Sequence, residues 1–126
     1  MVKAPYFRTV RPYFAELRPN YCEVALRKRW GVYNHLKTVH AIAVANALEA
    51  AMGGLAEATV PSGRRWIPKG MRLEYLALST TDLICTAQTE AGDWAGDVVE
   101  VRVVARRTDG VEVVRGVIEL HLSDRR

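Results

Sequence analysis

Cysteine is scarce in this chain, and the two that occur, Cys22 and Cys85, lie far apart in apolar or strand-like surroundings. A disulfide framework or a metal site needs a denser set of cysteines, or a short spacing between cysteine and histidine, and the sequence has neither. We therefore expect two reduced thiols, in the core or at the surface, and neither a bound metal ion nor a cofactor.

Long apolar runs are also missing. The most apolar stretch, residues 41–56, is interrupted by Asn46 and Glu49 and is shorter than the roughly 20 residues that a membrane-spanning helix needs. The first residues contain no apolar stretch with a cleavage-like site, so we expect no signal peptide. These absences predict a cytoplasmic protein with no membrane partner.

Neither sign of charge is strongly in excess. The chain has 18 Lys and Arg against 14 Asp and Glu, which gives a net charge of +4. A mildly basic balance favours phosphate-bearing partners. The basic residues are scattered among acidic ones, however, and no motif that reads RNA or DNA is present, so we expect no nucleic acid partner.

The chain does contain enough apolar residues for one core, since 49% of its 126 residues are hydrophobic. Residues 1–20 hold three prolines with aromatic residues between them, and we expect a lead-in of one or two short helices there. Asp109-Gly110 is a strong signal for a two-residue hairpin turn. Alternating apolar and polar residues predict strands over 21–30, 66–78, 82–90, 97–107 and 111–122.

One long helix is predicted, from an N-cap at Thr38 to about Glu57. Nine of the sixteen residues in the range 41–56 are Ala or Gly, and only Asn46 and Glu49 are polar. A helix that is apolar on every side leaves no face for water and is therefore buried. The order of the elements predicts an α+β domain in which a five- to six-stranded antiparallel sheet surrounds a central helix.

A single helix covers only one face of such a sheet and leaves long edge strands exposed, which proteins usually avoid. A homodimer that continues the sheet, or that buries a seam on the helix side, removes this exposure. We therefore expect a single domain over residues 1–126 that assembles as a homodimer or as a dimer of dimers, a homotetramer.

A polar segment leads into the helix and reads Asn34-His35-Leu36-Lys37-Thr38-Val39-His40-Ala41. The first backbone N–H groups of a helix have no partner within it, and the helix dipole is positive at that end. The segment is therefore suited to hold a phosphate or a developing oxyanion. Further along, Glu49 places a carboxylate in the apolar helix, which costs free energy unless the group is paired or has a role.

Structural explanations stay open for each of these residues. Asn34 can simply shape a turn, because asparagine tolerates left-handed backbone geometry. His35 and His40 can be turn and capping residues. Glu49 can be satisfied by a hydrogen bond from Asn46, three residues earlier on the helix, or by a dimer partner.

The segment from Asn34 to Ala41, with Glu49 eight residues later, resembles the helix-entry motif of hotdog-fold thioesterases of the phenylacetic-acid-degradation type. It is more similar still to their relatives with a domain of unknown function, the DUF4442 group. Residues 65–71, Arg-Trp-Ile-Pro-Lys-Gly-Met, followed by Glu-Tyr-Leu at 74–76, also resemble that group's second strand. The resemblance implies a hotdog fold, in which the sheet wraps around the long helix.

The resemblance also implies hydrolysis of an acyl-CoA or another acyl thioester. Asn34 would position the thioester or the attacking water. His40 would match the histidine just before the oxyanion donor, and Ala41 would match the small residue whose backbone N–H holds the thioester oxygen. Glu49 would act as base or nucleophile at a site shared with the other subunit.

Two departures from the family pattern favour an alternative, a non-catalytic protein that binds acyl thioesters or small apolar ligands. Ala41 stands where glycine is common, and residues 67–69 offer no hydroxyl where some relatives have Ser or Thr. Asn46, close to Glu49, is expected to help bind the substrate in either case. Four basic side chains are expected to cluster near the mouth of the dimer: Arg64, Arg65, Lys69 and Arg72. They suit the phosphates of coenzyme A, or else belong to an ordinary solvated strand end.

Overall fold

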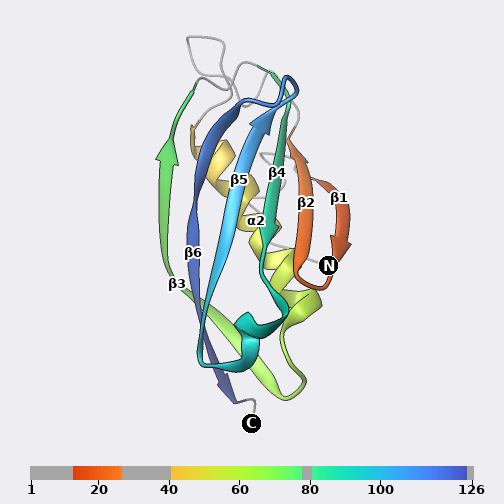
Figure 1. Ribbon diagram of the computed structural model, residues 1–126, viewed down its shortest axis with the longest axis vertical. Coiled ribbons are helices and arrows are strands. Elements are labelled where there is room, and N and C mark those ends of the chain that lie inside the picture. Colours follow the sequence, from red (N-terminus) through yellow and green to blue (C-terminus); the bar gives the residue numbers. More distant parts are fainter. Residues whose placement is uncertain (1–12, 27–40, 78–80, 125–126) are drawn as a thin grey trace.

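The computed structural model describes residues 13–26, 41–77 and 81–124 (Figure 1). The elements in chain order are strands β1 (Tyr13–Arg18) and β2 (Tyr21–Leu26), helix α2 (Ala41–Thr59), strands β3 (Arg64–Tyr75) and β4 (Leu83–Gln88), the 3-10 helix η2 (Ala91–Ala95), and strands β5 (Val98–Arg107) and β6 (Glu112–Asp124). The predicted N-cap Thr38 lies outside the described residues.

The strands form one antiparallel, six-stranded sheet in the order β1-β2-β4-β5-β6-β3. Figure 1 shows α2 lying along one face of this sheet, with β1 and β3 as the two edge strands. A long helix held against a curved antiparallel sheet is the α+β arrangement predicted from the order of the elements.

The structure differs from the expectation near the N-terminus. Residues 13–18 form strand β1, so the helical lead-in predicted over residues 1–20 is wrong for this part, and residues 1–12 lie outside the described chain. A tight turn joins β1 to β2, and Asn20 in this turn has a φ of 69°, a left-handed conformation that asparagine tolerates. β1 forms because β2 offers it an edge to pair with, and local sequence carries no information about that edge.

The core lies between α2 and the inner face of the sheet, and the predicted strand alternation accounts for it. Leu48 and Leu55 of α2 are fully buried, and each contributes about 2 kcal/mol through the apolar surface that it removes from water. The strands contribute alternating buried side chains: Cys22, Val24, Leu26, Leu83, Cys85, Ala87, Val99, Val101, Val103, Ala105, Val114, Ile118 and Leu120. Within the ranges described, no helix combines the length and the apolar character needed to cross a membrane.

Hydrogen bonds among buried and half-buried groups fasten the C-terminal end of α2. The backbone N–H of Asn20 donates to Oγ1 of Thr59 at 2.8 Å. The hydroxyl of Thr89 donates to Oδ1 of Asn20 at 2.7 Å, and the indole Nε1–H of Trp94 donates to the same hydroxyl at 3.0 Å. These contacts satisfy the buried polar groups of Thr89 and Trp94, and they tie the helix end to the β1–β2 turn and to the residue that follows β4.

Small residues allow α2 to approach the sheet closely. A Cβ atom added to Gly54 would lie 2.7 Å from Cε1 of Phe14 and 3.0 Å from Sγ of Cys22. The adjacent Gly53 faces a different side, where an added Cβ would come no closer than 4.0 Å to Cη2 of Trp66. Only Gly54 is therefore required by the packing of α2 against β1 and β2.

These neighbouring glycines give a matched pair of stability measurements. Gly54→Ala should lower the free energy of unfolding by about 1 to 3 kcal/mol, because the added methyl group has to displace Phe14 or Cys22. Gly53→Ala should raise it by about 0.5 to 1 kcal/mol, because alanine restricts the unfolded chain and the helix has room for the methyl group. Denaturant unfolding followed by circular dichroism measures both, and equal effects of the two substitutions would contradict the packing described.

Candidate active site

One stripe of residues on α2 faces away from the core and carries the helix's two carboxylates. We call it the Glu49 stripe, and its members are Asn46, Glu49, Gly53 and Glu57. Their spacing of three and four residues places them on one side of the helix. None of them belongs to the cluster of buried residues that packs on the sheet. Asn46 and Glu49 are half-buried, Gly53 is buried, and Glu57 is exposed.

Within the described part of the chain, Glu49 does not form the hydrogen bond that would give it a purely structural role. Among the described residues, it shares no hydrogen bond with Asn46 and forms no ion pair. The next residue of the stripe towards the C-terminus is Gly53, which has no side chain to cover the carboxylate. Glu49 itself is only half-buried, so part of it is accessible on the side of α2 that the sheet does not cover.

Trp66, near the start of β3, forms a wall at the C-terminal end of the Glu49 stripe. It is paired in register with Leu122 of β6, which is buried, so its side chain lies on the inner side of the sheet. Its indole Nε1–H donates to Oε2 of Glu57 at 2.8 Å, and its ring lies over Gly53. Neither Trp66 nor Glu57 was selected as a site residue from the sequence, although the spacing from Glu49 to Glu57 already places both acids on one side of the helix.

The inner side of β3 beyond Trp66 is mostly uncovered. α2 packs chiefly on β1, β2, β4 and β5. Met71 and Tyr75 lie opposite the buried Ile118 and Val114, yet they are 44% and 53% exposed. An apolar surface that should face the core therefore remains open along this edge strand.

The start of α2 lies at the other end of the stripe, and Ala41 is the first helical residue. The candidate residues Asn34 and His40, with His35, lie outside the described residues. Ala41 precedes Glu49 by eight residues, which is about 12 Å along the helix axis. An oxyanion donor and a general base must both lie within about 3 Å of the groups on which they act. One subunit therefore cannot bring its own α2 start and its own Glu49 to the same carbonyl group.

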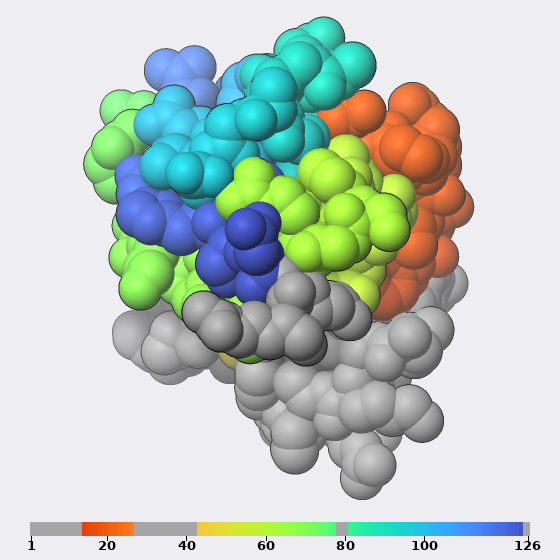
Figure 2. All heavy atoms as spheres, turned by 90° about the horizontal axis from the view of Figure 1, so that it is seen from below, coloured from red at the N-terminus to blue at the C-terminus, as the bar shows by residue number. Residues whose placement is uncertain are grey.

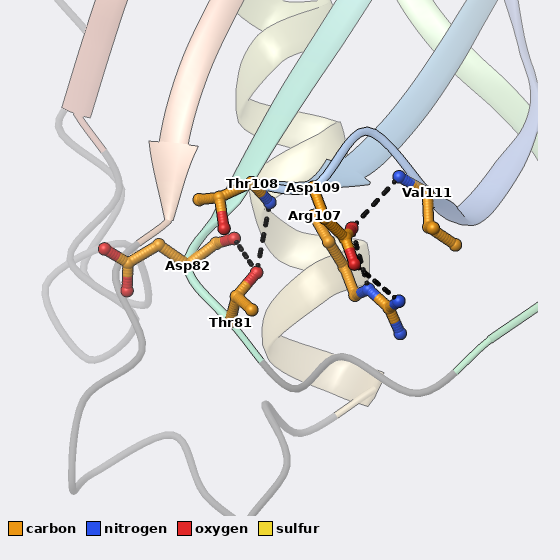
Figure 3. A network of polar contacts seen from close by, with 6 residues as sticks. All are labelled: Thr81, Asp82, Arg107, Thr108, Asp109 and Val111. Atoms are coloured by element: carbon orange, nitrogen blue, oxygen red, sulfur yellow. Dashed lines mark hydrogen bonds and ion pairs between the residues drawn. The ribbon is translucent and has the colours of Figure 1, made fainter.

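The hairpin between β5 and β6 lies at the same end of the molecule as the start of α2 (Figure 1). Figure 3 shows Arg107 holding Asp109 through two hydrogen bonds, from Nε to Oδ1 at 3.1 Å and from Nη2 to Oδ2 at 2.8 Å. The bonds from Arg107 lower the pKa of the Asp109 carboxyl below its usual 3.8. Oγ1 of Thr81 accepts the N–H of Thr108 at 3.2 Å, which joins the hairpin to the start of β4. Arg107 is thus a basic residue at this end that the sequence motifs did not indicate.

Arg64, predicted to bind substrate, lies at the opposite end of the molecule from the start of α2. Its guanidinium donates to Oδ1 of Asp97 at 2.7 Å and to the carbonyl of Gly96 at 3.3 Å, and Nε lies 3.4 Å from Oδ1 of Asp124. Figure 2 shows this end, where the turn after α2 (yellow-green) lies between the last residues of β6 (dark blue) and the η2 segment (cyan). These partners give Arg64 a structural role in closing this end.

The four basic residues predicted to form one cluster are instead spread along β3. Arg65 donates from Nε to Oγ of Ser123 at 3.3 Å. Lys69 is exposed at an irregularity in the pairing of β3 with β6. Arg72 lies on the face of the sheet away from α2, where it lines a shallow groove of about 410 Å³ together with Arg102 and other residues of β3, β5 and β6. One subunit does not bring these side chains together.

The two thiols are confirmed as free and buried. Burial raises the pKa of Cys22 to about 11 and that of Cys85 to about 12. A thiol that stays neutral in an apolar core is neither a nucleophile nor a metal ligand. Across the described ranges, no group of three or more His, Cys, Asp and Glu side chains is arranged to hold a metal ion. The carboxylates of the Glu49 stripe are therefore the strongest chemical candidates.

Comparison with known protein families now identifies the chain. The family model described as a domain of unknown function, DUF4442, matches residues 1–122. The chain belongs to the DUF4442 family. This confirms the resemblance predicted from the segment that enters α2. A comparison with curated proteins gives no match.

Solved structures show that this DUF4442 chain has the hotdog fold. A structural-genomics protein, APC5556, is 46% identical with a TM-score of 0.90, and the match covers 96% of this chain and 82% of that one. The thioesterase HI1161 from Haemophilus influenzae is 7% identical with a TM-score of 0.83, over 94% of this chain and 82% of that one. BH2602 from Bacillus halodurans, solved with CoA, is 18% identical with a TM-score of 0.81, over 97% and 78% of the two chains.

The state of the thiols leads to a direct prediction for the DUF4442 chain. Neither Cys22 nor Cys85 should react with a disulfide reagent such as DTNB in the native protein near pH 8, because both are buried and neutral at that pH. Both should react in denaturant, and absorbance at the thiolate product band measures the difference. Fast labelling of the folded protein would show that the β2 and β4 thiols are accessible.

Proposed function

We propose that this DUF4442 protein hydrolyses acyl thioesters, with acyl-CoA as substrate and Glu49 as the general base. The observation that carries the proposal is the position of Glu49, a half-buried carboxylate with no ion-pair partner among the described residues, on an otherwise apolar helix. Such a group costs free energy and is retained where it has a role. The thioesterase HI1161 and the CoA-bound BH2602 share the fold, which supports the proposed substrate class.

The proposed reaction needs a base and an oxyanion donor. Glu49 removes a proton from water as the water oxygen attacks the thioester carbonyl carbon. Backbone N–H groups at the start of an α2 helix, including that of Ala41, hold the carbonyl oxygen while it carries negative charge. Collapse of the tetrahedral intermediate breaks the C–S bond, and the thiolate of coenzyme A takes the proton from Glu49, which releases the acid and the free thiol.

The distance between Ala41 and Glu49 supports a site that two subunits build together. Because about 12 Å separates them along one helix, the α2 start that serves Glu49 has to come from a partner. β3 offers a surface for this partner, since it is an edge strand with exposed apolar residues: Ile67, Met71 and Tyr75. Antiparallel pairing of two β3 edges continues the sheet around a two-fold axis and sets the two α2 helices antiparallel, so each helix start lies near the other helix's later turns.

The same arrangement offers a role for the basic residues of β3. Antiparallel β3 edges bring the first residues of one strand to the last residues of the other, which lie at the end where α2 starts. Arg65 and Lys69 of one subunit would then lie near the α2 start of its partner. Guanidinium and ammonium groups there suit the phosphates of coenzyme A. Arg64 is already occupied by Asp97 and Asp124.

A second candidate function is binding of an acyl thioester or a small apolar ligand without turnover. It is favoured by Ala41, which adds a methyl group at a position where glycine is common in the related thioesterases. Thermal stabilisation of the protein by acyl-CoA, with no release of free thiol, would support this alternative over hydrolysis.

Glu49→Gln tests the role of the base. The substitution keeps the size of the side chain and removes its ability to take a proton, so kcat for acyl-CoA hydrolysis should fall by about 10²- to 10⁴-fold. The thermal unfolding temperature should change little. Thiol release followed with DTNB measures turnover, and Glu100→Gln on the solvent-exposed face of β5 is the matched control. An active parent protein with an equally active Glu49→Gln variant would remove Glu49 from the mechanism.

A subunit-mixing experiment tests whether the site is shared. Ala41→Pro removes one backbone N–H at the first position of α2, a position where helices accept proline, and it should abolish oxyanion stabilisation. When Ala41→Pro and Glu49→Gln chains are mixed after unfolding, each heterodimer regains one intact site. Random pairing then predicts recovery of about a quarter of the parental activity from two inactive proteins. A site contained within one subunit would give no recovery.

A further inference from the structure

Trp66 occupies a fixed position on the route that an acyl chain would follow from Glu49. The route runs along the Glu49 stripe and, one turn beyond Glu49, meets the indole ring, which lies over the buried Gly53. The ring lies at van der Waals distance from the place of an added Cβ on Gly53, with Cη2 at 4.0 Å. The open inner side of β3 borders the same route with Met71.

Three sets of contacts hold this wall in place. The indole N–H is hydrogen-bonded to Glu57 at 2.8 Å, which fixes the plane of the ring. Trp66 packs against the buried core and is paired with Leu122 of β6. Two residues earlier on β3, Arg64 binds Asp97 and Asp124 and anchors the start of the strand. A side chain held in this way resists displacement by a ligand.

We infer that Trp66 closes the acyl pocket beside Glu49 and sets the longest acyl chain that the site accepts. This inference rests on the proposed thioesterase function and names its substrate class as short- to medium-chain acyl thioesters. The helix gives the scale, since Glu49 lies about 6 Å from Gly53 and about 12 Å from Glu57 along the axis. An acyl chain that extends from Glu49 past Gly53 meets the indole ring.

The chain-length profile tests the inference directly. For the parent protein, kcat/KM measured over straight-chain acyl-CoA esters from acetyl to palmitoyl should rise and then fall sharply at one length. Trp66→Ala should move that limit to longer chains, with a gain of about fourfold in kcat/KM for each newly admitted methylene. Trp66→Phe, which keeps much of the bulk, should move it less. For short acyl chains, kcat/KM of both variants should stay within a few-fold of the parent value.

A second variant tests the wall without removing a large side chain. Gly53→Ala places one methyl group against the indole and should shorten the longest accepted chain, while the protein becomes more stable rather than less. Val98→Ala is the control, since Val98 alternates with the buried Val99 along β5 and is 50% exposed on the face of the sheet away from α2. Its chain-length limit should match that of the parent.

The possible results separate failure of this inference from failure of the proposed function. Hydrolysis by the parent, with one chain-length limit shared by the parent, Trp66→Ala and Gly53→Ala, would overturn the role of Trp66 and leave the thioesterase standing. Absence of hydrolysis combined with absence of binding to a non-hydrolysable thioether analogue, measured by calorimetry, would overturn both. Shifts of the limit in opposite directions in Trp66→Ala and Gly53→Ala are the expected result.

Discussion

The close approach of α2 to the sheet is the contact on which the rest of the molecule depends. At Gly54 the helix backbone lies so near Phe14 and Cys22 that even a methyl group would overlap them. This closeness lets Leu48 and Leu55 reach the inner face of the sheet and fill the core. It also turns the opposite side of the helix, with Asn46 and Glu49, away from the sheet.

One helix of 19 residues cannot cover six strands, and this shortage has two consequences. The inner side of β3 stays open, so Met71 and Tyr75 are exposed at positions whose strand partners are buried. In addition, the start of the helix and Glu49 are too far apart to act on one group within a single subunit. The proposed dimer, in which a second copy pairs along β3, would resolve both features.

The two ends of the molecule differ in their polar chemistry. At the end where α2 finishes, Arg64 is held by Asp97 and Asp124, and the buried Thr89 joins hydrogen bonds from separate elements. Charged and polar groups there pair with one another and hold neighbouring segments of the chain together. The other end carries the start of α2, whose first N–H groups have no partners within the helix. The anionic substrate that we propose is therefore better accommodated at the end where α2 begins.

The sequence by itself determined the class of fold and the core. The Ala- and Gly-rich helix and the strict alternation in β2, β4 and β5 predicted which side chains are buried, because these patterns follow from helix and strand geometry alone. The composition of the helix also singled out Glu49. β1 was missed, since a strand at the edge of a sheet forms only when its neighbour offers hydrogen bonds.

Only the tertiary structure decided how the candidate site residues are arranged. Arg64, Arg65, Lys69 and Arg72 are close in sequence, yet an extended strand spreads them over most of its length and onto different faces. Trp66 and Glu57 meet because the register of β3 against β6 turns the indole inward, and Arg107 reaches the end where α2 starts through the β5–β6 hairpin. Such contacts join segments that are distant in the chain, so they depend on packing and strand register rather than on any local pattern.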